Sequence, residues 1–413
     1  MTRGISILFY FAVAAGTCLM AGKIQPDRAG GPVRDHGRRT AKSFCNRLLA
    51  VGIFCILFSV MALRFDIGND YRQYTQTAHE AYVGGYVVTE AGFNWLVRML
   101  YGIAGGEYYE LVFAVFAFVT LLFFLKAFLR QSVRFSQTFF LFMTLGLYFQ
   151  TFNTVRYYLA LAIALFSMKY VLEKDYLKFV FWIGMAAMFH KSVLLVLPAY
   201  WLASFEWKRW QIAAGLVVSG ACFLGKGLVL KLALVLYPSY RDTVYLEGGG
   251  SLTGTLRTLA VLALYVWFVY IYRYACEQPG ETCQQETQGV RRVIKHIVHG
   301  DVSAGASLKE QGWYPELRFY GQLNLLALVT GTFFSFLPVV TRISYYFTVS
   351  QLFLIPLILQ NIKEQRTRRK VMVIIFAVCI LYFVVFLLQA HQDGVKLLPY
   401  RSWLFETERY TYK

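Results

Sequence analysis

Four arginines lie at the ends of apolar segments, far apart in the chain, and each has a tyrosine in its segment. The arginines are Arg64, Arg156, Arg342 and Arg401, and the tyrosines are Tyr71, Tyr157, Tyr345 and Tyr400. A guanidinium is planar, permanently charged and forked, which suits the oxygens of phosphate or pyrophosphate. The aromatic rings suit a ligand that also carries sugars and an apolar tail. We therefore predict a binding site made of these residues together with Asn153.

His190 lies between two short apolar segments and is followed by Lys191 and Ser192. Histidine is the usual general base near neutral pH, so His190 is a candidate catalytic residue. The plainer alternative is that an isolated histidine is a hydrogen-bonded packing residue.

The arginines also have plainer explanations. Arg64 could pair with Asp66 or Asp70, and Arg156 could tie its helix to a neighbour. Arg342 and Arg401 could extend to lipid headgroups while their stems stay in apolar surroundings.

The composition indicates which kind of fold must position these residues. The chain has 413 residues, of which 57% are hydrophobic and only 15% charged, and its mean hydropathy is +0.48. Soluble proteins carry about 25% charged residues. Apolar runs such as 111–125, 256–272 and 371–388 approach the ~20 residues that cross a bilayer. We predict an all-α polytopic transmembrane bundle of about 11–13 helices, in one integral membrane domain over residues 1–413.

The apolar runs set the expected helices. They are 5–22, 47–63, 108–127, 135–150, 152–172, 176–190, 192–205, 211–229, 256–272, 319–338, 343–361 and 371–389. Segment 91–104 is amphipathic and is expected to lie along the outer interface. The pair 176–190 and 192–205 is short for two spans, which places His190 at a hairpin tip. The first helix precedes a basic stretch instead of a cleavage site, so we expect it to be retained.

The formal charge of +18 comes from Lys and Arg in short segments between apolar runs. Such segments lie on the cytoplasmic side of membrane proteins, and this pattern argues against nucleic-acid binding. The densest are 23–47, 126–134, 169–178, 207–210, 273–318 and 363–370. They fall on one side if the chain crosses the membrane twice between each pair. This arrangement puts the outer side of the cytoplasmic membrane next to the four arginines, His190 and both termini. Loop 276–312 is then expected to be a flexible loop on the cytoplasmic side.

No metal or nucleotide cofactor is expected. The seven cysteines lack the spacing of metal ligands, and the chain has no Asp-x-Asp motif and no glycine-rich nucleotide loop.

Several of these polar segments form an ordered pattern. The chain resembles the EpsG family of bacterial membrane proteins, which are polysaccharide polymerases of the Wzy type. The pattern comprises Arg64, Gly68-Asn69-Asp70-Tyr71, Tyr74, Asn153-x-x-Arg156-Tyr157-x-x-Ala160, Phe189-His190, Arg342-x-x-Tyr345 and Pro399-Tyr400-Arg401. The family usually has Thr in place of Asn69 and Gln in place of Tyr157.

The resemblance implies polymerisation of oligosaccharide repeat units carried on undecaprenyl pyrophosphate, for an exopolysaccharide or capsule. Outward arginines would stabilise the pyrophosphate leaving group. His190 would take the proton of the acceptor hydroxyl, with Asp70 in reserve. The expected partners are the lipid-linked oligosaccharide, membrane lipid, and a flippase and chain-length regulator of the same pathway.

Other functions fit parts of the pattern. A flippase for lipid-linked sugars would also need cations and aromatic residues, but along a central path. A membrane acyltransferase would use a histidine, commonly with a donor from the cytoplasmic side. A ligase that moves finished polymer to another acceptor would share the chemistry of the polymerase.

Overall fold

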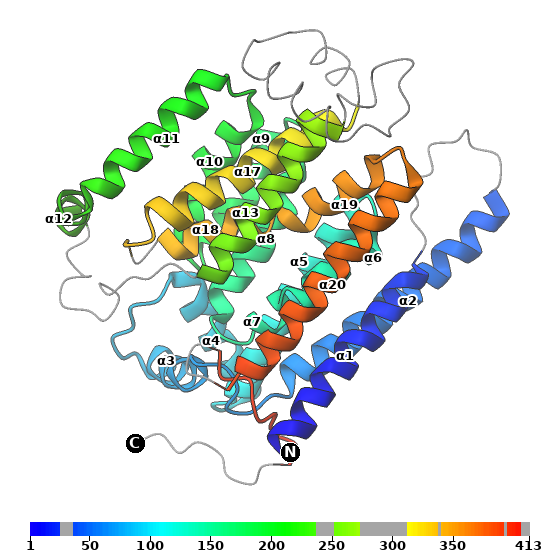
Figure 1. Cartoon of the computed structure of the whole chain (residues 1–413). Helices are drawn as coiled ribbons and strands as arrows, with labels where there is room; N and C mark the ends of the chain where they lie inside the picture. Colours follow the sequence, from blue (N-terminus) through cyan, green and yellow to red (C-terminus); the bar gives the residue numbers. More distant parts are fainter. Residues whose placement is uncertain (25–35, 237–251, 273–311, 338–339, 392–394, 406–413) are drawn as a thin grey trace. The chain divides into compact units, whose positions relative to one another are not determined.

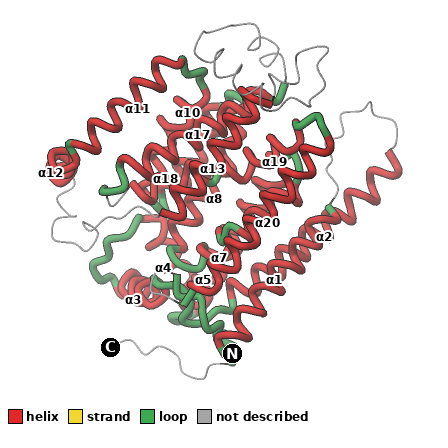
Figure 2. Tube along the Cα trace, in the orientation of Figure 1, coloured by secondary structure: helices red, strands yellow, loops and turns green. Residues whose placement is uncertain are grey.

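The computed structural model describes residues 1–24, 36–236, 252–272, 312–337, 340–391 and 395–405. These residues form helices and loops, and Figure 2 shows no strand among them. Within them the only β-type pairing is an isolated bridge between Arg64 and Ser402. The predicted all-α polytopic bundle is confirmed. The predicted loop 276–312 lies outside the described residues, apart from Gly312.

Seven of the described helices are long and apolar enough to cross a membrane. They are Arg3–Lys23, Phe44–Ala62, Tyr109–Gln131, Val155–Leu172, Leu252–Val269, Arg342–Asn361 and Gln365–Gln389. Helices α11 (Arg209–Leu224) and α12 (Lys226–Leu236) meet at 86° and make an eighth span if counted together. Two shorter apolar helices are Tyr176–Ala187 and Lys191–Ser204. The chain is therefore a multi-pass membrane protein.

The chain divides into two compact units. Unit 1 comprises Met1–Lys169, Leu177–Leu194 and Glu364–Lys413, and unit 2 comprises Tyr170–Tyr176 and Leu195–Lys363. The single integral membrane domain over the whole chain stays a prediction.

Unit 1 is built around helix α5 (Tyr109–Gln131), which has a phenylalanine-rich face. Its helices are α1 (Arg3–Lys23), α2 (His36–Ala62), α3 (Tyr71–Val83), α4 (Ala91–Ala104), α5 (Tyr109–Gln131), α6 (Phe135–Thr144), α7 (Leu147–Gln150), most of α8 (Val155–Leu172), α9 (Tyr176–Ala187) and α20 (Gln365–Gln389). Phe113, Phe116, Phe124 and Phe128 of α5 are buried at helical spacing. Helix α2 packs against α5, and α1 runs alongside α2 (Figure 1).

The C-terminal segment 395–405 closes unit 1 at the ends of α1 and α2. The backbone N–H of Tyr400 donates to the hydroxyl of Ser6 (2.9 Å), and the Tyr400 hydroxyl donates to the carbonyl of Val60 (3.2 Å). The same segment accepts backbone bonds from Phe65 (3.0 Å) and Gly68 (2.9 Å). These bonds hold the loop between α2 and α3 in place.

Unit 2 is organised by one long helix, α17 (Tyr314–Phe333). This helix packs against α10 (Val196–Ser204), α11, α13 (Leu252–Val266), α18 (Val340–Thr348) and α19 (Gln351–Asn361). A polar cluster lies buried among them. Gln351 donates to the side chain of Asn324 (2.7 Å), and Asn324 donates to the carbonyl of Thr258 (3.2 Å). Such bonds between helices are a common means of association in membranes.

Several helix bounds differ from those expected. Helix α2 begins at His36 rather than near residue 47, because it continues through the basic stretch. The expected helix 135–150 divides at Gly146, which has φ +73°. The expected helix 211–229 divides at Gly225. Helix α4 coincides with the amphipathic segment 91–104, and the expected break at His190 is present between α9 and the 3₁₀ helix Lys191–Leu195.

Candidate functional site

A close backbone approach joins two of the predicted site segments. Gly68 has φ +98°, and a Cβ at this position would lie 2.3 Å from the carbonyl oxygen of Phe152. Only glycine fits both the conformation and the space. The approach lets the Asn69 N–H donate to the Asn153 side chain (3.0 Å). The Thr154 hydroxyl donates to Asp70 (2.9 Å).

Asp70 and Tyr71 begin α3, but they lie in different surroundings. Asp70 is half-buried at the N-cap position, and its carboxylate does not cap the helix. Tyr71 is buried, and its ring stacks on Phe113 at 4.4 Å. Asp70 is therefore more accessible to a ligand than Tyr71 is in this structure.

Arg64 is enclosed by unit 1. Its side chain is 1% exposed, and its two Nη atoms donate to the carbonyls of Met61 and Phe152. The guanidinium also lies over the rings of Phe113 (4.9 Å) and Phe152 (5.3 Å). Burial lowers the pKa of Arg64 to about 10, so the group remains charged at neutral pH. In this structure Arg64 ties the end of α2 to the segment before α8, and its contact with pyrophosphate stays a prediction.

Arg156, at the start of α8, faces α3 and the start of α4. Its Nη1 is paired with the carboxylate of Glu90, and its Nε donates to the hydroxyl of Tyr74 (3.4 Å). The guanidinium lies over the rings of Tyr74 (5.5 Å) and Phe93 (5.3 Å). Its Nη2 has no hydrogen-bond partner among the residues that the structure describes. Arg156 is thus held by Glu90 and Tyr74, and its Nη2 group remains as a hydrogen-bond donor for a ligand.

His190 approaches the same carboxylate from the other side. Its Nδ1 lies 3.8 Å from Oε1 of Glu90, and the backbone N–H of Lys191 donates to that oxygen (3.1 Å). The ring of Tyr157 packs edge-on against the imidazole, with centroids 5.4 Å apart. Arg156 and His190, more than thirty residues apart in the chain, therefore meet at one acid.

That acid, Glu90, is the residue that the sequence interpretation missed. It immediately precedes an amphipathic helix, where an acid commonly interacts with the positive end of the helix dipole. The neighbouring Gly92 gives a further signal, because its backbone N–H donates to the carbonyl of Met188 (3.0 Å). A Cβ at Gly92 would lie 2.6 Å from the Met188 oxygen. This close approach brings the start of α4 against the segment that carries His190.

The remaining predicted residues lie elsewhere. Tyr400 is buried against α1 and α2, whereas the side chain of Arg401 is exposed. Arg342 is exposed and Tyr345 is half-buried. Both lie on α18 of unit 2, whereas the cluster around Glu90 belongs to unit 1.

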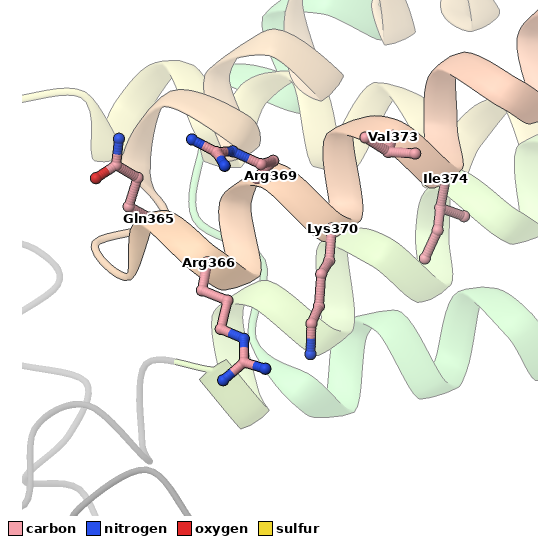
Figure 3. Close-up of a pocket in the computed structure, with 6 residues that line it drawn as sticks. All are labelled: Gln365, Arg366, Arg369, Lys370, Val373 and Ile374. Carbon is pink, nitrogen blue, oxygen red and sulfur yellow. The ribbon is translucent and has the colours of Figure 1, made fainter.

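Two open grooves are lined by other residues. One, of about 790 Å³, follows the first turns of α20 and is lined by Arg366, Arg369 and Lys370 before the apolar Val373 and Ile374. Arg366 and Lys370 extend from the same side of the helix (Figure 3). The other, of about 510 Å³, lies between α11 and neighbouring helices of unit 2 and is mostly apolar. Neither contains a predicted site residue.

No group of three or more His, Cys, Asp or Glu side chains in the described part of the chain could hold a metal ion.

Together, fold and site define a multi-pass helical membrane protein in which an arginine, a histidine and a carboxylate meet at helix ends. The chain belongs to the EpsG family, whose model matches residues 47–402. This is a family of Wzy-type polymerases, which gives the chain a polysaccharide polymerase-like role in general. No curated protein and no solved structure matched the chain.

Proposed function

We propose that this chain polymerises oligosaccharide repeat units carried on undecaprenyl pyrophosphate, for an exopolysaccharide or capsule. The reaction would take place at the outer face of the bacterial cytoplasmic membrane, where the growing glycan moves onto the next lipid-linked unit. Family membership supports the general role. The observation that carries the site is the meeting of Arg156 and His190 at Glu90.

The chemistry requires a base and a group that stabilises negative charge. The acceptor hydroxyl gives its proton to His190 while its oxygen bonds to the anomeric carbon of the growing chain. The bond from that carbon to the pyrophosphate oxygen breaks, and undecaprenyl pyrophosphate leaves with the electron pair. Arg156 would stabilise the developing charge through its remaining Nη2 donors. Fixed donors are effective here because they need no reorganisation during the reaction.

Other residues take supporting roles in this proposal. The exposed Arg401 would bind the anionic ligand and Arg64 would support the site from within unit 1, while Arg342 of unit 2 remains a candidate contact. Asp70 is the reserve base. Asn153 and the tyrosines Tyr71, Tyr157, Tyr345 and Tyr400 remain candidate contacts for sugar or for the apolar tail.

The outward orientation is supported by the basic segments. The start of α20 carries Arg366, Arg369 and Lys370 on exposed positions, as expected of a cytoplasmic helix end (Figure 3). Helix α20 then ends at Gln389, shortly before the segment that holds loop 63–70. A single crossing by α20 would put residues 395–405 on the outer side of the membrane, which supports the proposed orientation.

The test is the length distribution of surface polysaccharide in cells that lack the gene. The deletion should leave single repeat units or none, and wild type should restore long chains. Arg156→Ala and His190→Ala should not restore them, whereas the matched exposed control Arg366→Ala should. Each variant must first be shown to reach the membrane in normal amount and with a normal melting temperature. Full-length chains in both site variants would overturn the site assignment.

The same experiment separates the alternatives. Normal-length chains that are not attached to their final acceptor would indicate a ligase. Unchanged length with altered acylation would indicate an acyltransferase. Repeat units that accumulate on the cytoplasmic side would indicate a flippase.

A further inference from the structure

Loop 63–70 and the segment before α8 present polar atoms of opposite kind next to each other. Their close approach lets the Asn69 N–H donate to Oδ1 of Asn153 (3.0 Å). The Thr154 hydroxyl donates to Oδ2 of Asp70 (2.9 Å). Asp70, Asn153 and Thr154 are all half-buried. The three side chains are therefore tied together and remain within reach of a ligand.

Each of these two bonds determines which atom of the side chain is left over. Because Oδ1 of Asn153 accepts a backbone N–H, the remaining group of its amide is Nδ2, a donor. Asp70 uses Oδ2 for Thr154 and does not cap its own helix, so Oδ1 remains as an acceptor. Neither Nδ2 of Asn153 nor Oδ1 of Asp70 has a hydrogen-bond partner within the described ranges of the chain.

Arg156 belongs to the same neighbourhood, and Tyr74 connects it to Asp70. Tyr74 follows Asp70 by one turn of α3, and its hydroxyl accepts from Nε of Arg156 (3.4 Å). Burial raises the pKa of Tyr74, Arg156 lowers it and Asp70 raises it, so both charged groups act on one hydroxyl. Thr154 and Arg156 are also only two residues apart in the chain. The open donor and acceptor thus adjoin the guanidinium that the proposed function assigns to pyrophosphate.

The sign of the charge divides a lipid-linked sugar between these groups. A carboxylate only accepts hydrogen bonds and repels phosphate, so Asp70 is unsuited to the pyrophosphate. A sugar hydroxyl both donates and accepts. It can donate to Oδ1 of Asp70 and accept from Nδ2 of Asn153, whereas the forked donors of Arg156 suit phosphate oxygens.

We infer that Asp70 and Asn153 form a subsite for a sugar hydroxyl group of the substrate, and that Thr154 is a positioning residue that holds the Asp70 carboxylate. The inference rests on the proposed function, since it names the part of the lipid-linked oligosaccharide that these residues bind. It gives Asp70 a binding role besides that of the reserve base. Thr154 acts through its bond to Asp70 and not through contact with the sugar.

Two probes that differ only in their sugars test this subsite. They are undecaprenyl pyrophosphate and the lipid-linked repeat unit extracted from cells that lack the gene, both radiolabelled. Binding to the full-length protein in lipid nanodiscs is measured on ice, and a gel confirms that the repeat unit has not been polymerised. The wild type should bind the repeat unit more tightly than it binds undecaprenyl pyrophosphate.

Asp70→Asn should weaken binding of the repeat unit by about 10-fold, because the hydroxyl loses a charged acceptor. Its binding of undecaprenyl pyrophosphate should be unchanged or tighter, because a negative charge that repels phosphate is gone. Arg156→Gln should weaken the binding of both probes. The control is Glu80→Gln, which removes another half-buried carboxylate of α3 and should change neither affinity. Glu80 accepts from Gln76 of the same helix (3.1 Å).

Thr154 gives a second test if Asp70→Asn does not fold. Thr154→Val keeps the shape of the side chain but removes the hydroxyl, so the carboxylate is no longer held. The repeat unit should then bind about 3-fold more weakly, with no change for undecaprenyl pyrophosphate. Thr154→Ser keeps the hydroxyl and should bind both probes as the wild type does. A purely structural bond between the loops would instead weaken both probes alike in Thr154→Val and lower its melting temperature.

The outcomes separate this inference from the proposed function. Equal losses for both probes, or no loss for either, in Asp70→Asn and Thr154→Val overturn the inference while the proposed function stands. A wild type that binds neither probe overturns the proposed function and the inference with it. Selective loss of the repeat unit in Asp70→Asn, together with full-length polysaccharide from Arg156→Ala and His190→Ala cells, supports the sugar subsite and overturns the chemistry assigned to those two residues.

Discussion

The hydroxyl oxygen of Tyr74 lies 3.4 Å from Nε of Arg156, and the ring of the same tyrosine lies 5.5 Å from the guanidinium carbon. Tyr74 therefore contacts Arg156 both through a hydrogen bond and through its aromatic face. Glu90 holds a second nitrogen of the same guanidinium. Together the two residues fix the orientation of Arg156 and leave Nη2 for a ligand.

Tyr74→Phe separates the hydrogen bond from the ring contact. The variant keeps the aromatic face and loses the acceptor for Nε, so we expect polymer synthesis to fall by about 2- to 10-fold. The measurement is the amount of long-chain polysaccharide made by membranes supplied with lipid-linked repeat units. The control is Tyr86→Phe, because Tyr86 is 89% exposed. Equal synthesis by Tyr74→Phe and wild type would show that the hydroxyl does not orient Arg156.

Gly68→Ala tests the close approach that joins loop 63–70 to the segment before α8. The added Cβ would meet the Phe152 carbonyl at 2.3 Å, in addition to the cost of φ +98°. We expect the free energy of unfolding to fall by clearly more than the ~1 kcal/mol typical of a left-handed conformation alone. The measurement is the melting temperature of the detergent-solubilised protein.

Gly84→Ala is a matched control for this prediction. Gly84 also has a positive φ, +83°, but a Cβ there would have no atom within 4 Å. Its substitution should lower the melting temperature only slightly. Similar losses from Gly68→Ala and Gly84→Ala would mean that the loop moves aside without penalty.

The sequence predicts the membrane-embedded part of this fold well, because hydropathy is a direct physical signal. Helix α4 and most of α5 lie where the apolar pattern places them. Helix α3 was missed because its residues are mostly polar. Its buried face, with Tyr71, Tyr74 and Ala78, appears only at helical spacing. The break at Gly225 was missed because the apolar run continues across it.

The sequence singles out some of the residues that the fold brings together, and their role as a site stays a prediction. Asn153 and Asp70, which were expected to belong to one site, do lie at adjoining segments. Glu90 could not be singled out, because one acid before an amphipathic helix is most simply a partner of the helix dipole. Pairing it with Arg156 and His190 requires the tertiary contact between the start of α4 and the end of α9. Spacing along the chain does not encode that contact.

Arg64→Met distinguishes a structural arginine from one that binds the substrate. Arg64 is buried and donates to the carbonyls of Met61 and Phe152, so its loss leaves buried acceptors without donors. We expect the free energy of unfolding to fall by about 2–3 kcal/mol, as for hydrogen bonds that involve a charged group. Thermal unfolding of the purified protein measures this. A normal melting temperature with abolished synthesis would instead favour direct contact with pyrophosphate.

Unlike Arg64→Met, Arg401→Ala should lower polysaccharide synthesis without lowering the melting temperature. The backbone of Arg401 is fixed, because its carbonyl accepts the Phe65 N–H at 3.0 Å, while its side chain is exposed. Removal of an exposed cation usually changes stability by no more than about 0.5 kcal/mol, so the melting temperature should stay the same. Synthesis should still fall if the guanidinium binds the pyrophosphate, and the deficit should appear as weaker apparent affinity for the lipid-linked substrate. Arg401→Lys keeps the charge but not the forked donors and should recover only part of that affinity. Unchanged affinity in both variants would leave Arg401 as a residue that contacts lipid headgroups and would remove it from the site.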